Sequence, residues 1–282
     1  TNFSPASRHA VEYARTFFGD TATDFHLLYP HPDAPDGIQP PRYVADTTRV
    51  SYVAKLHEAV GILRDETITD WHTFRSSDKP GQSFDVVEES VEDESYDIVV
   101  IGPNEDGTDI VFGNSAIALI RKLKANVLVV PGEAPVRPIH QIVLAIDFAN
   151  LTNFSLLDSV KQLVLLKGST LTLLTIDTPG KKVIHVEQEA KIRQYLRPIE
   201  PTIARIQATV AKQGIDEFLA GHTVDLLVTI PRYKGQPNPT GTNSHVRAMA
   251  FSPAVPLLTI YDDARIEYPE HIEDLSNLDF AM

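Results

Sequence analysis

The chain has no cysteine, and its 282 residues include one tryptophan and two methionines. Without cysteine it can form neither a disulfide nor a thiolate metal site. This is typical of proteins in a reducing compartment, so we expect a cytoplasmic protein. The longest apolar runs, such as residues 127–131, are far below the roughly 20 residues that span a bilayer, and no membrane role is expected. No secretion leader is visible at the start.

Basic residues are scarce: 25 Lys and Arg stand against 38 Asp and Glu, which gives a formal charge of −13. A protein that grips a nucleic-acid backbone needs the opposite sign, so no nucleic-acid partner is expected. Backbone amides can still hold a single nucleotide, whatever the net charge. The composition is otherwise ordinary for a globular protein, and at roughly 150 residues per domain the length favours about two domains.

The sequence contains an internal repeat with a period of about 130 residues. Residues 97–103 align with residues 225–231. Beyond each segment, an Asn-Ser pair and then an apolar run follow at equal spacing. These are Asn114-Ser115 and the run from Leu128 in the first copy, and Asn243-Ser244 and the run from Leu257 in the second. Ordered matches at constant spacing indicate two copies of one fold.

Each copy alternates short apolar runs with helical patterns. In the second copy, the runs 142–146, 171–176, 224–230 and 256–261 have the length of buried strands, and helices are expected over 154–165, 187–213 and 244–250. This order predicts right-handed crossovers and a parallel sheet covered on both faces. We therefore predict an α/β chain of two tandem doubly wound domains, 1–132 and 139–263, with an acidic tail over 264–282.

The first copy has no counterpart of the strand expected at 142–146, because it opens on a helix that Ser4 caps and Pro5 begins. The opening strand of such a sheet is usually internal. Its loss would leave two neighbouring strands with unpaired backbone groups. We therefore expect that residues before Thr1 are missing; the alternative is an authentic four-stranded variant.

Several segments carry a resemblance to a known family. They are residues 1–5, 97–102, 112–115 and 127–131 in the first copy, and 146–148 and 224–232 in the second. In these segments the chain resembles a tandem universal stress protein, to about Asp263. The resemblance implies a five-stranded parallel sheet in each domain, a role in the stress response, and final strands that pair across a two-fold axis. Such pairing makes an intramolecular pseudo-dimer or, between chains, a homodimer.

Nucleotide-binding members of the family carry a loop of the form Gly, two residues, Gly, nine residues, Gly-Ser/Thr after the fourth strand. Glycines let the backbone approach phosphates, and amides at a helix start donate to them. Gly102 and Gly113 match the ends of this motif, whereas Glu105 replaces the middle glycine and would repel a phosphate. The candidate ligand contacts in the first copy are then Asn2, Gly102, Pro103, Gly107, Gly113, Asn114 and Ser115.

The second copy departs further from the motif. Ile230 takes the place of the first glycine, and Pro231 has no N–H to donate. The resemblance assigns the acidic residue that faces the adenosine to Asp147, whose counterpart in the first copy is Asn2. Asp147, Asn243 and Ser244 are the candidate contacts here. The structural alternative remains open in both copies: glycines that only shape turns, and polar residues that only cap helices.

No constellation for catalysis or metal binding is present in the sequence. It contains no Gly-x-Ser-x-Gly elbow, no Gly-x-x-x-x-Gly-Lys-Ser/Thr loop, and no His-x-x-x-His pair with an acidic neighbour. We expect no metal and, on balance, no enzyme. Two hypotheses follow: a stress-response regulatory protein with ATP or AMP at the first-copy loop, or an interaction scaffold for unknown protein partners whose loops are purely structural.

Overall fold

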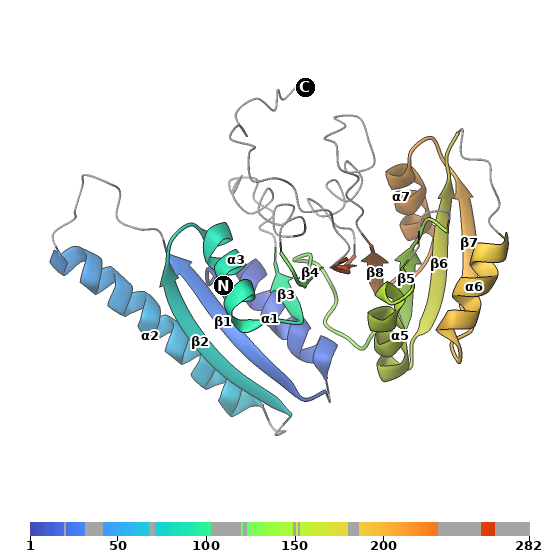
Figure 1. Ribbon diagram of the computed structural model, residues 1–282. Helices are drawn as coiled ribbons and strands as arrows, with labels where there is room; N and C mark the ends of the chain where they lie inside the picture. Colours follow the sequence, from blue (N-terminus) through green and yellow to red (C-terminus); the bar gives the residue numbers. More distant parts are fainter. Residues whose placement is uncertain are drawn as a thin grey trace.

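A computed structural model describes residues 1–19, 21–31, 42–67, 71–102, 120, 123–148, 151, 153–179, 186–230 and 255–262. The first repeat contains α1 (Pro5–Phe18), β1 (Thr23–His31), α2 (Arg42–Glu66), β2 (His72–Pro80), α3 (Ser83–Glu94), β3 (Ile98–Ile101) and β4 (Asn126–Val129). The second contains β5 (Gln141–Ala145), α5 (Leu156–Lys167), β6 (Thr170–Asp177), α6 (Val186–Leu196), β7 (Thr202–Gln207), α7 (Ala211–Gly221), β8 (Leu226–Thr229) and β9 (Leu257–Thr259). Strands and helices alternate as predicted from α1 to β3 and from β5 to β8 (Figure 1), and the helix predicted over 244–250 and the tail over 264–282 lie outside the described residues.

The second repeat forms a parallel sheet with strand order β7-β6-β5-β8-β9. β5 is its central strand, because Ile142 pairs with Leu171 of β6 and with Leu226 of β8. Ile142, Val143 and Leu144 are all at most 3% exposed, so both faces of β5 are buried. Burial on both faces explains why this strand is a continuous apolar run rather than an alternating one.

In the first repeat the corresponding strands fall into two groups. β1 and β2 pair in parallel as a two-stranded sheet, whereas β3 and β4 pair in parallel at the end of the larger sheet. In Figure 1, β1 and β2 lie on the side of β3 that faces away from β4. Within the described residues no strand lies between β1 and β3.

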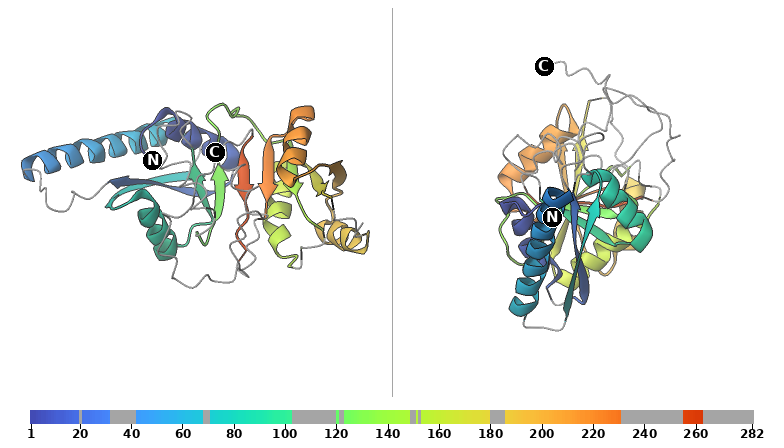
Figure 2. Two further views of the ribbon diagram at one scale, coloured as in Figure 1. Left: turned by 90° about the horizontal axis from the view of Figure 1, so that it is seen from above. Right: turned by 90° about the vertical axis from the view of Figure 1, so that its left-hand side faces the viewer.

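The two repeats join through the antiparallel pairing of β4 with β9, which makes one seven-stranded sheet (Figure 2, left). Leu128 pairs with Leu258 at the centre of this contact. The sequence alignment of Leu128 with Leu257 is wrong by one residue. Val99 pairs with Val127 in the first repeat and its counterpart Leu227 pairs with Leu257 in the second, so Leu128 corresponds to Leu258.

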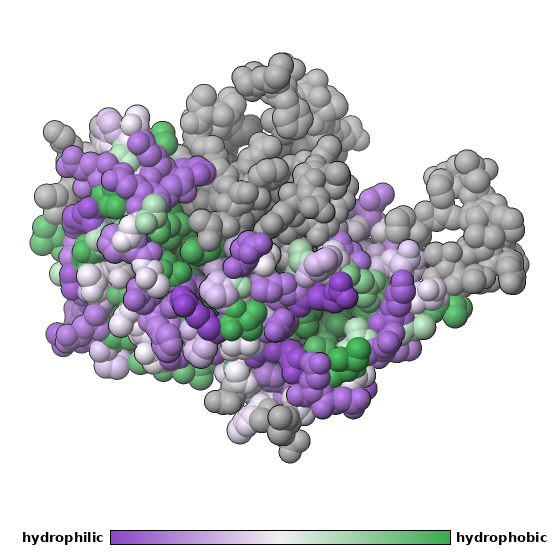
Figure 3. All heavy atoms as spheres, turned by 180° about the vertical axis from the view of Figure 1, so that it is seen from behind, coloured by the Kyte–Doolittle hydropathy of each residue, from purple (hydrophilic) through white to green (hydrophobic). Residues whose placement is uncertain are grey.

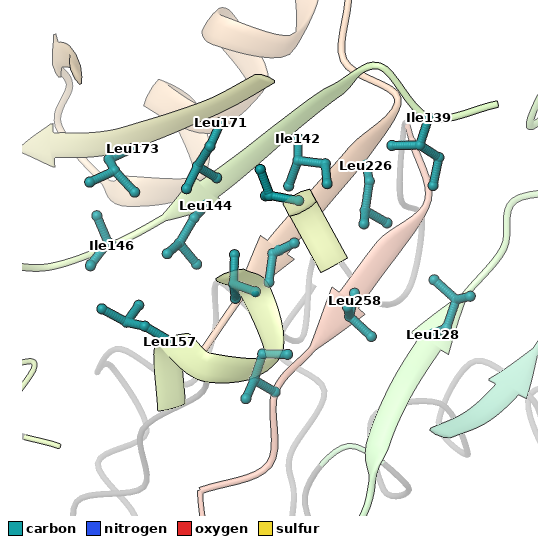
Figure 4. Close-up of a cluster of buried hydrophobic side chains, with 14 of the residues drawn as sticks. Leu128, Ile139, Ile142, Leu144, Ile146, Leu157, Leu171, Leu173, Leu226 and Leu258 are labelled. Atoms are coloured by element: carbon teal, nitrogen blue, oxygen red, sulfur yellow. The ribbon is translucent and has the colours of Figure 1, made fainter. Parts of the chain in front are cut away.

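Helices cover both faces of the seven-stranded sheet (Figure 2). Buried residues of α1, α5 and α6 pack on one face, and those of α3 and α7 pack on the other. The first core runs without a break across the junction of the repeats, since Leu128 and Leu258 lie on the same face as Leu144 and Leu157 (Figure 4). A third, smaller core holds α2 against β1 and β2.

The helix predicted over 187–213 is wrong, because β7 lies within that range between α6 and α7. α6 ends at Leu196, and Pro198 and Pro201 follow before the strand begins. Proline provides no N–H to continue a helix and disfavours helical geometry in the residue before it. Among the described strands, β7 pairs only with β6 and is an edge strand. Its residues are exposed or partly exposed, so its sequence contains no continuous apolar run.

On the face shown in Figure 3, hydrophobic residues of the described part form small areas separated by hydrophilic ones. Large hydrophobic side chains that are about half exposed or more occur singly along the described chain, except for the neighbouring pair Leu165 and Leu166. This is ordinary for a folded surface. Among the described helices, none is both long and apolar enough to cross a bilayer.

Candidate functional site

The carboxyl ends of the parallel strands form one candidate site in each repeat. β3 runs parallel to β4, β4 runs antiparallel to β9, and β9 runs parallel to β8 and thus to β5. The carboxyl ends of the two sets of strands therefore lie at opposite edges of the seven-stranded sheet. Gly102 follows β3 and Asp147 follows β5. These two predicted contacts belong to separate sites.

At the first edge, Asn2 forms a turn that leads into α1. Its Oδ1 accepts a hydrogen bond from the backbone N–H of Ser4 at 3.1 Å. Ser4 caps the helix, with its side chain accepting from the N–H of Ser7 at 3.1 Å. The Thr1 and Ser7 hydroxyls are hydrogen-bonded at 2.5 Å. Asn2 is therefore held in place, and its oxygen already has a structural role in the turn before the helix.

Gly102 lies against the first turns of α1. A Cβ atom at this position would be 2.3 Å from the carbonyl oxygen of Ala6 and 3.1 Å from the Cβ of Ala10. Only glycine lets the backbone of β3 and the backbone of α1 come this close. The contact places the start of α1, which follows Asn2, next to the end of β3. The structure thus brings Asn2 and Gly102 to one edge.

At the second edge, Asp147 is exposed and directly follows the buried Ile146. The turn before α5 is formed by a residue that sequence analysis passed over. Asn153 Oδ1 accepts hydrogen bonds from the N–H of Ser155 at 3.1 Å and from its hydroxyl at 2.7 Å. Asn2 and Asn153 each lie two residues before a serine that caps a helix, and each accepts a hydrogen bond from the N–H of that serine. This Asn-x-Ser spacing is the sequence signal that could have identified Asn153.

The remaining predicted contacts lie outside the described residues. They are Pro103, Gly107, Gly113, Asn114 and Ser115 in the first repeat, and Asn243 and Ser244 in the second. Glu105 lies outside them as well.

A polar cluster that sequence analysis did not anticipate joins α3 to the β1–β2 sheet. His26 Nε2 is 2.7 Å from the Ser77 hydroxyl, and its Nδ1 is hydrogen-bonded to the Tyr96 hydroxyl. Arg75 and Glu94 form an ion pair at 2.6 Å. Burial, together with the Arg75 guanidinium, lowers the pKa of His26. Both nitrogens of the His26 ring are thus engaged, and the cluster holds α3 in place rather than presenting a free group to a ligand.

A second cluster lies at the amino end of β8, where Asp225 binds the segment that leads into β5. Its carboxylate accepts hydrogen bonds from the N–H groups of His140 at 3.0 Å and Gln141 at 2.9 Å, and from Arg137 Nη2 at 2.7 Å. Burial by itself raises the pKa of the Asp225 carboxyl, but these donors outweigh it and hold the pKa below its ordinary value. Asp225 thus fixes the start of the central strand.

Beside Asp225 is a cavity of about 50 Å³, which Tyr13 of α1, Arg137 and Val255 help to line. Burial and the Asp225 charge raise the pKa of the Tyr13 hydroxyl. Pockets for small molecules measure roughly 300–1,000 Å³, so this cavity is of a size for water molecules and not for a nucleotide. It lies at the amino end of β8, which is the sheet edge opposite to the one that carries Asp147. Within the described part of the chain, no group of three His, Asp or Glu residues could hold a metal ion.

Comparison with known proteins extends these observations. The model of the universal stress protein family matches residues 1–131. A universal stress protein from Archaeoglobus fulgidus has a similar structure, with a TM-score of 0.67 and 16% sequence identity over 92% of this chain and 93% of that one. A putative universal stress protein from Pseudomonas aeruginosa is similar with a TM-score of 0.57 and 15% identity, over 89% of this chain and 87% of that one. No curated protein matches the chain in sequence.

At these identities the two structures support the fold alone, and they do so over almost the whole length of both repeats. The family match covers the first repeat, including Asn2 and Gly102. The first repeat, residues 1–131, thus matches the universal stress protein family in sequence, and the fold of the whole chain is similar to that of two universal stress proteins.

Proposed function

We propose that this protein is a stress-response regulator that binds an adenine nucleotide, ATP or AMP, at the carboxyl edge of the first repeat. The observation that carries the proposal is the convergence of Asn2 and Gly102 there through the close contact of Gly102 with Ala6. Ligands of open parallel sheets bind beyond the carboxyl ends of the strands, at the point where the strand order reverses. In the second repeat that point lies between β5 and β8, at Ile146 and Ile230. The residues of the first repeat that align with these two are Thr1 and Gly102.

The chain has a net charge of −13, which disfavours a phosphate, but the residues expected at this edge are suited to bind one. Gly102 begins a loop in which Gly107 and Gly113 follow, and Asn114-Ser115 close the motif of the family's nucleotide-binding members. Backbone N–H groups of such a loop donate hydrogen bonds to phosphate without a basic side chain. The family resemblance supplies the adenine nucleotide as the ligand class.

A second candidate is an interaction protein that binds no nucleotide. Two observations favour it. The packing of α1 accounts for Gly102 without any ligand, and the Asn2 oxygen is already used by the Ser4 N–H. Glu105, in the place of the middle glycine, adds a negative charge to the loop.

Thermal unfolding of the full chain with ATP, AMP and GTP, each with and without Mg²⁺, separates the two candidates. A ligand at 100 times its Kd stabilises the folded state by about 2.7 kcal/mol, so the nucleotide hypothesis predicts a higher Tm with the adenine nucleotides. Gly113→Trp should abolish this shift. Gly241→Trp, the matched change in the second loop, should leave it intact. An unchanged Tm with every nucleotide would favour the interaction protein.

A further inference from the structure

The cavity beside Asp225 lies where the two repeats meet. Its walls come from α1 of the first repeat, from the segment 133–139 that links the repeats, and from the residues that precede β8 and β9. Tyr13 belongs to the first repeat and is 3% exposed, and Asp225 belongs to the second and has a side chain that is 7% exposed. Each repeat therefore contributes a buried polar side chain to the same cavity.

The hydroxyl of Tyr13 is buried without a hydrogen-bond partner among the described residues. The charge of Asp225 acts on this hydroxyl, since it raises the pKa of Tyr13 together with burial. A hydroxyl that leaves water without gaining a new partner destabilises the fold, and buried polar groups in folded proteins are therefore bonded to the protein or to ordered water. The Tyr13 hydroxyl thus calls for a partner inside the cavity.

The packing of α1 does not by itself require a hydroxyl at this position. Ser4 caps α1 and Ser155 is the cap residue of α5. Counted from these two serines, Tyr13 corresponds to Val164, which is 2% exposed and belongs to the same core. An apolar side chain therefore suffices where α5 packs on the sheet. The polar end of Tyr13 is an addition of the first repeat, at the point where α1 faces the cavity.

Asp225 has an acceptor position to spare. Its Oδ2 accepts the N–H groups of His140 and Gln141, and its Oδ1 accepts a hydrogen bond from Arg137 at 2.7 Å. Within the described part of the chain, Arg137 is the only donor to Oδ1. A carboxylate oxygen can accept two hydrogen bonds, so Oδ1 can accept one more. Because the Tyr13 hydroxyl does not bond to Asp225 directly, a link between them needs a molecule that both donates and accepts.

The size of the cavity selects this molecule. A water molecule needs roughly 10–15 Å³ of such a space, so a cavity of about 50 Å³ has room for about three. A buried water makes about three hydrogen bonds to polar groups that would otherwise lack partners. The Tyr13 hydroxyl and the Asp225 carboxylate are groups of this kind.

We propose that the cavity is a hydration site, and that water within it joins the two repeats by accepting from the Tyr13 hydroxyl and donating to the Asp225 carboxylate. Asp225 holds His140 and Gln141 at the start of β5, so the water connects α1 to the central strand of the second repeat. Pro256, which directly precedes β9, lines the same cavity. The polar link therefore lies beside the apolar contact of β4 with β9 and adds a directional interaction to it.

Tyr13→Phe in the full chain tests the proposal, because it removes the hydroxyl alone. If water bonds the hydroxyl, the variant loses a hydrogen bond. Its unfolding equilibrium constant should then rise about fivefold and its Tm should fall by about 2–4 °C in calorimetry. If the hydroxyl were buried without a partner, phenylalanine would remove the cost of burying it. A Tm equal to or above that of the parent chain would therefore overturn the proposal.

Tyr195→Phe is the matched control, since it makes the same chemical change at an exposed site. The Tyr195 hydroxyl donates to Asp158 at 2.8 Å, and an exposed contact of this kind contributes little to stability. The Tm of the control should fall less than that of Tyr13→Phe. Equal losses in the two variants would show that the Tyr13 hydroxyl has no special partner, and would overturn the proposal.

A crystal structure of the full chain that resolves ordered water provides the direct check. It should show water within about 2.5–3.0 Å of the Tyr13 hydroxyl, hydrogen-bonded to the Asp225 carboxylate either directly or through a second water. A Tyr13 hydroxyl that bonds directly to a protein group, or that contacts apolar atoms alone, would overturn the proposal whatever the two Tm values are.

Discussion

Replacement of Gly102 by alanine tests the contact that builds the candidate site. The added Cβ would lie 2.3 Å from the carbonyl oxygen and 2.8 Å from the carbonyl carbon of Ala6. Both are backbone atoms of α1, so no side-chain rotation can relieve the overlap. α1 would have to move away from β3, and the Asn2 turn that precedes α1 would move with it.

The expected cost follows from the overlap. Adding a methyl group to a fully packed position typically costs about 1–3 kcal/mol. With a urea m-value of roughly 2 kcal/mol/M, such a loss lowers the unfolding midpoint of the first repeat by about 0.5–1.5 M. Trp71 fluorescence follows this transition, since the chain has no other tryptophan and Trp71 adjoins β2.

Gly61→Ala is the matched control, because it makes the same chemical change where there is space. Gly61 lies within α2, and a Cβ there would meet nothing within 4 Å. Alanine is a better helix former than glycine by roughly 0.5–1 kcal/mol, so this variant should be more stable than the parent chain. The reasoning is refuted if Gly102→Ala unfolds at the parent midpoint while Gly61→Ala shows the expected gain.

Two further outcomes are expected. Asp225→Ala leaves the N–H groups of His140 and Gln141 without their acceptor, so it should lower the free energy of unfolding of the second repeat by about 2–4 kcal/mol. Urea titrations followed by circular dichroism measure this loss. A free energy of unfolding equal to that of the parent chain would show that water replaces the carboxylate. Leu258→Ala opens a cavity at the β4–β9 contact, so it should lower the free energy of unfolding by about 2–5 kcal/mol. Calorimetry measures this change. A smaller loss would mean that the side chains at the junction repack.

The buried strands were predictable because of how they are buried. β5, β6 and β8 are covered on both faces, so their sequences are continuous apolar runs that a single reading of the chain detects. β7 was not predicted, because it is an edge strand whose residues are exposed or partly exposed. Its sequence contains as many polar residues as a surface helix, and only the two prolines before it argue against one.

The contacts of the candidate sites were less predictable, for a physical reason. The Asp225 carboxylate and Arg137 are 88 residues apart in the sequence, and no local pattern connects them. Gly102 was identified as a position that requires glycine, but a glycine that accommodates a helix and a glycine that accommodates a phosphate look alike in a sequence. The contact with Ala6 is visible only once α1 is placed against β3.

The opposite directions of the two repeats limit how their sites can communicate. A ligand beside Gly102 and a group beside Asp147 would lie at opposite edges of one sheet, so neither can touch the other. Any coupling must pass through the packed junction, where Leu128 and Leu258 belong to the same core as residues of α1 and α5. Such coupling needs two distinct arrangements of that junction, because a packed core transmits a change only when it can switch between them. Leu128 and Leu258 are 0% and 3% exposed, so a ligand at one edge would have to repack this buried junction in order to affect the other edge.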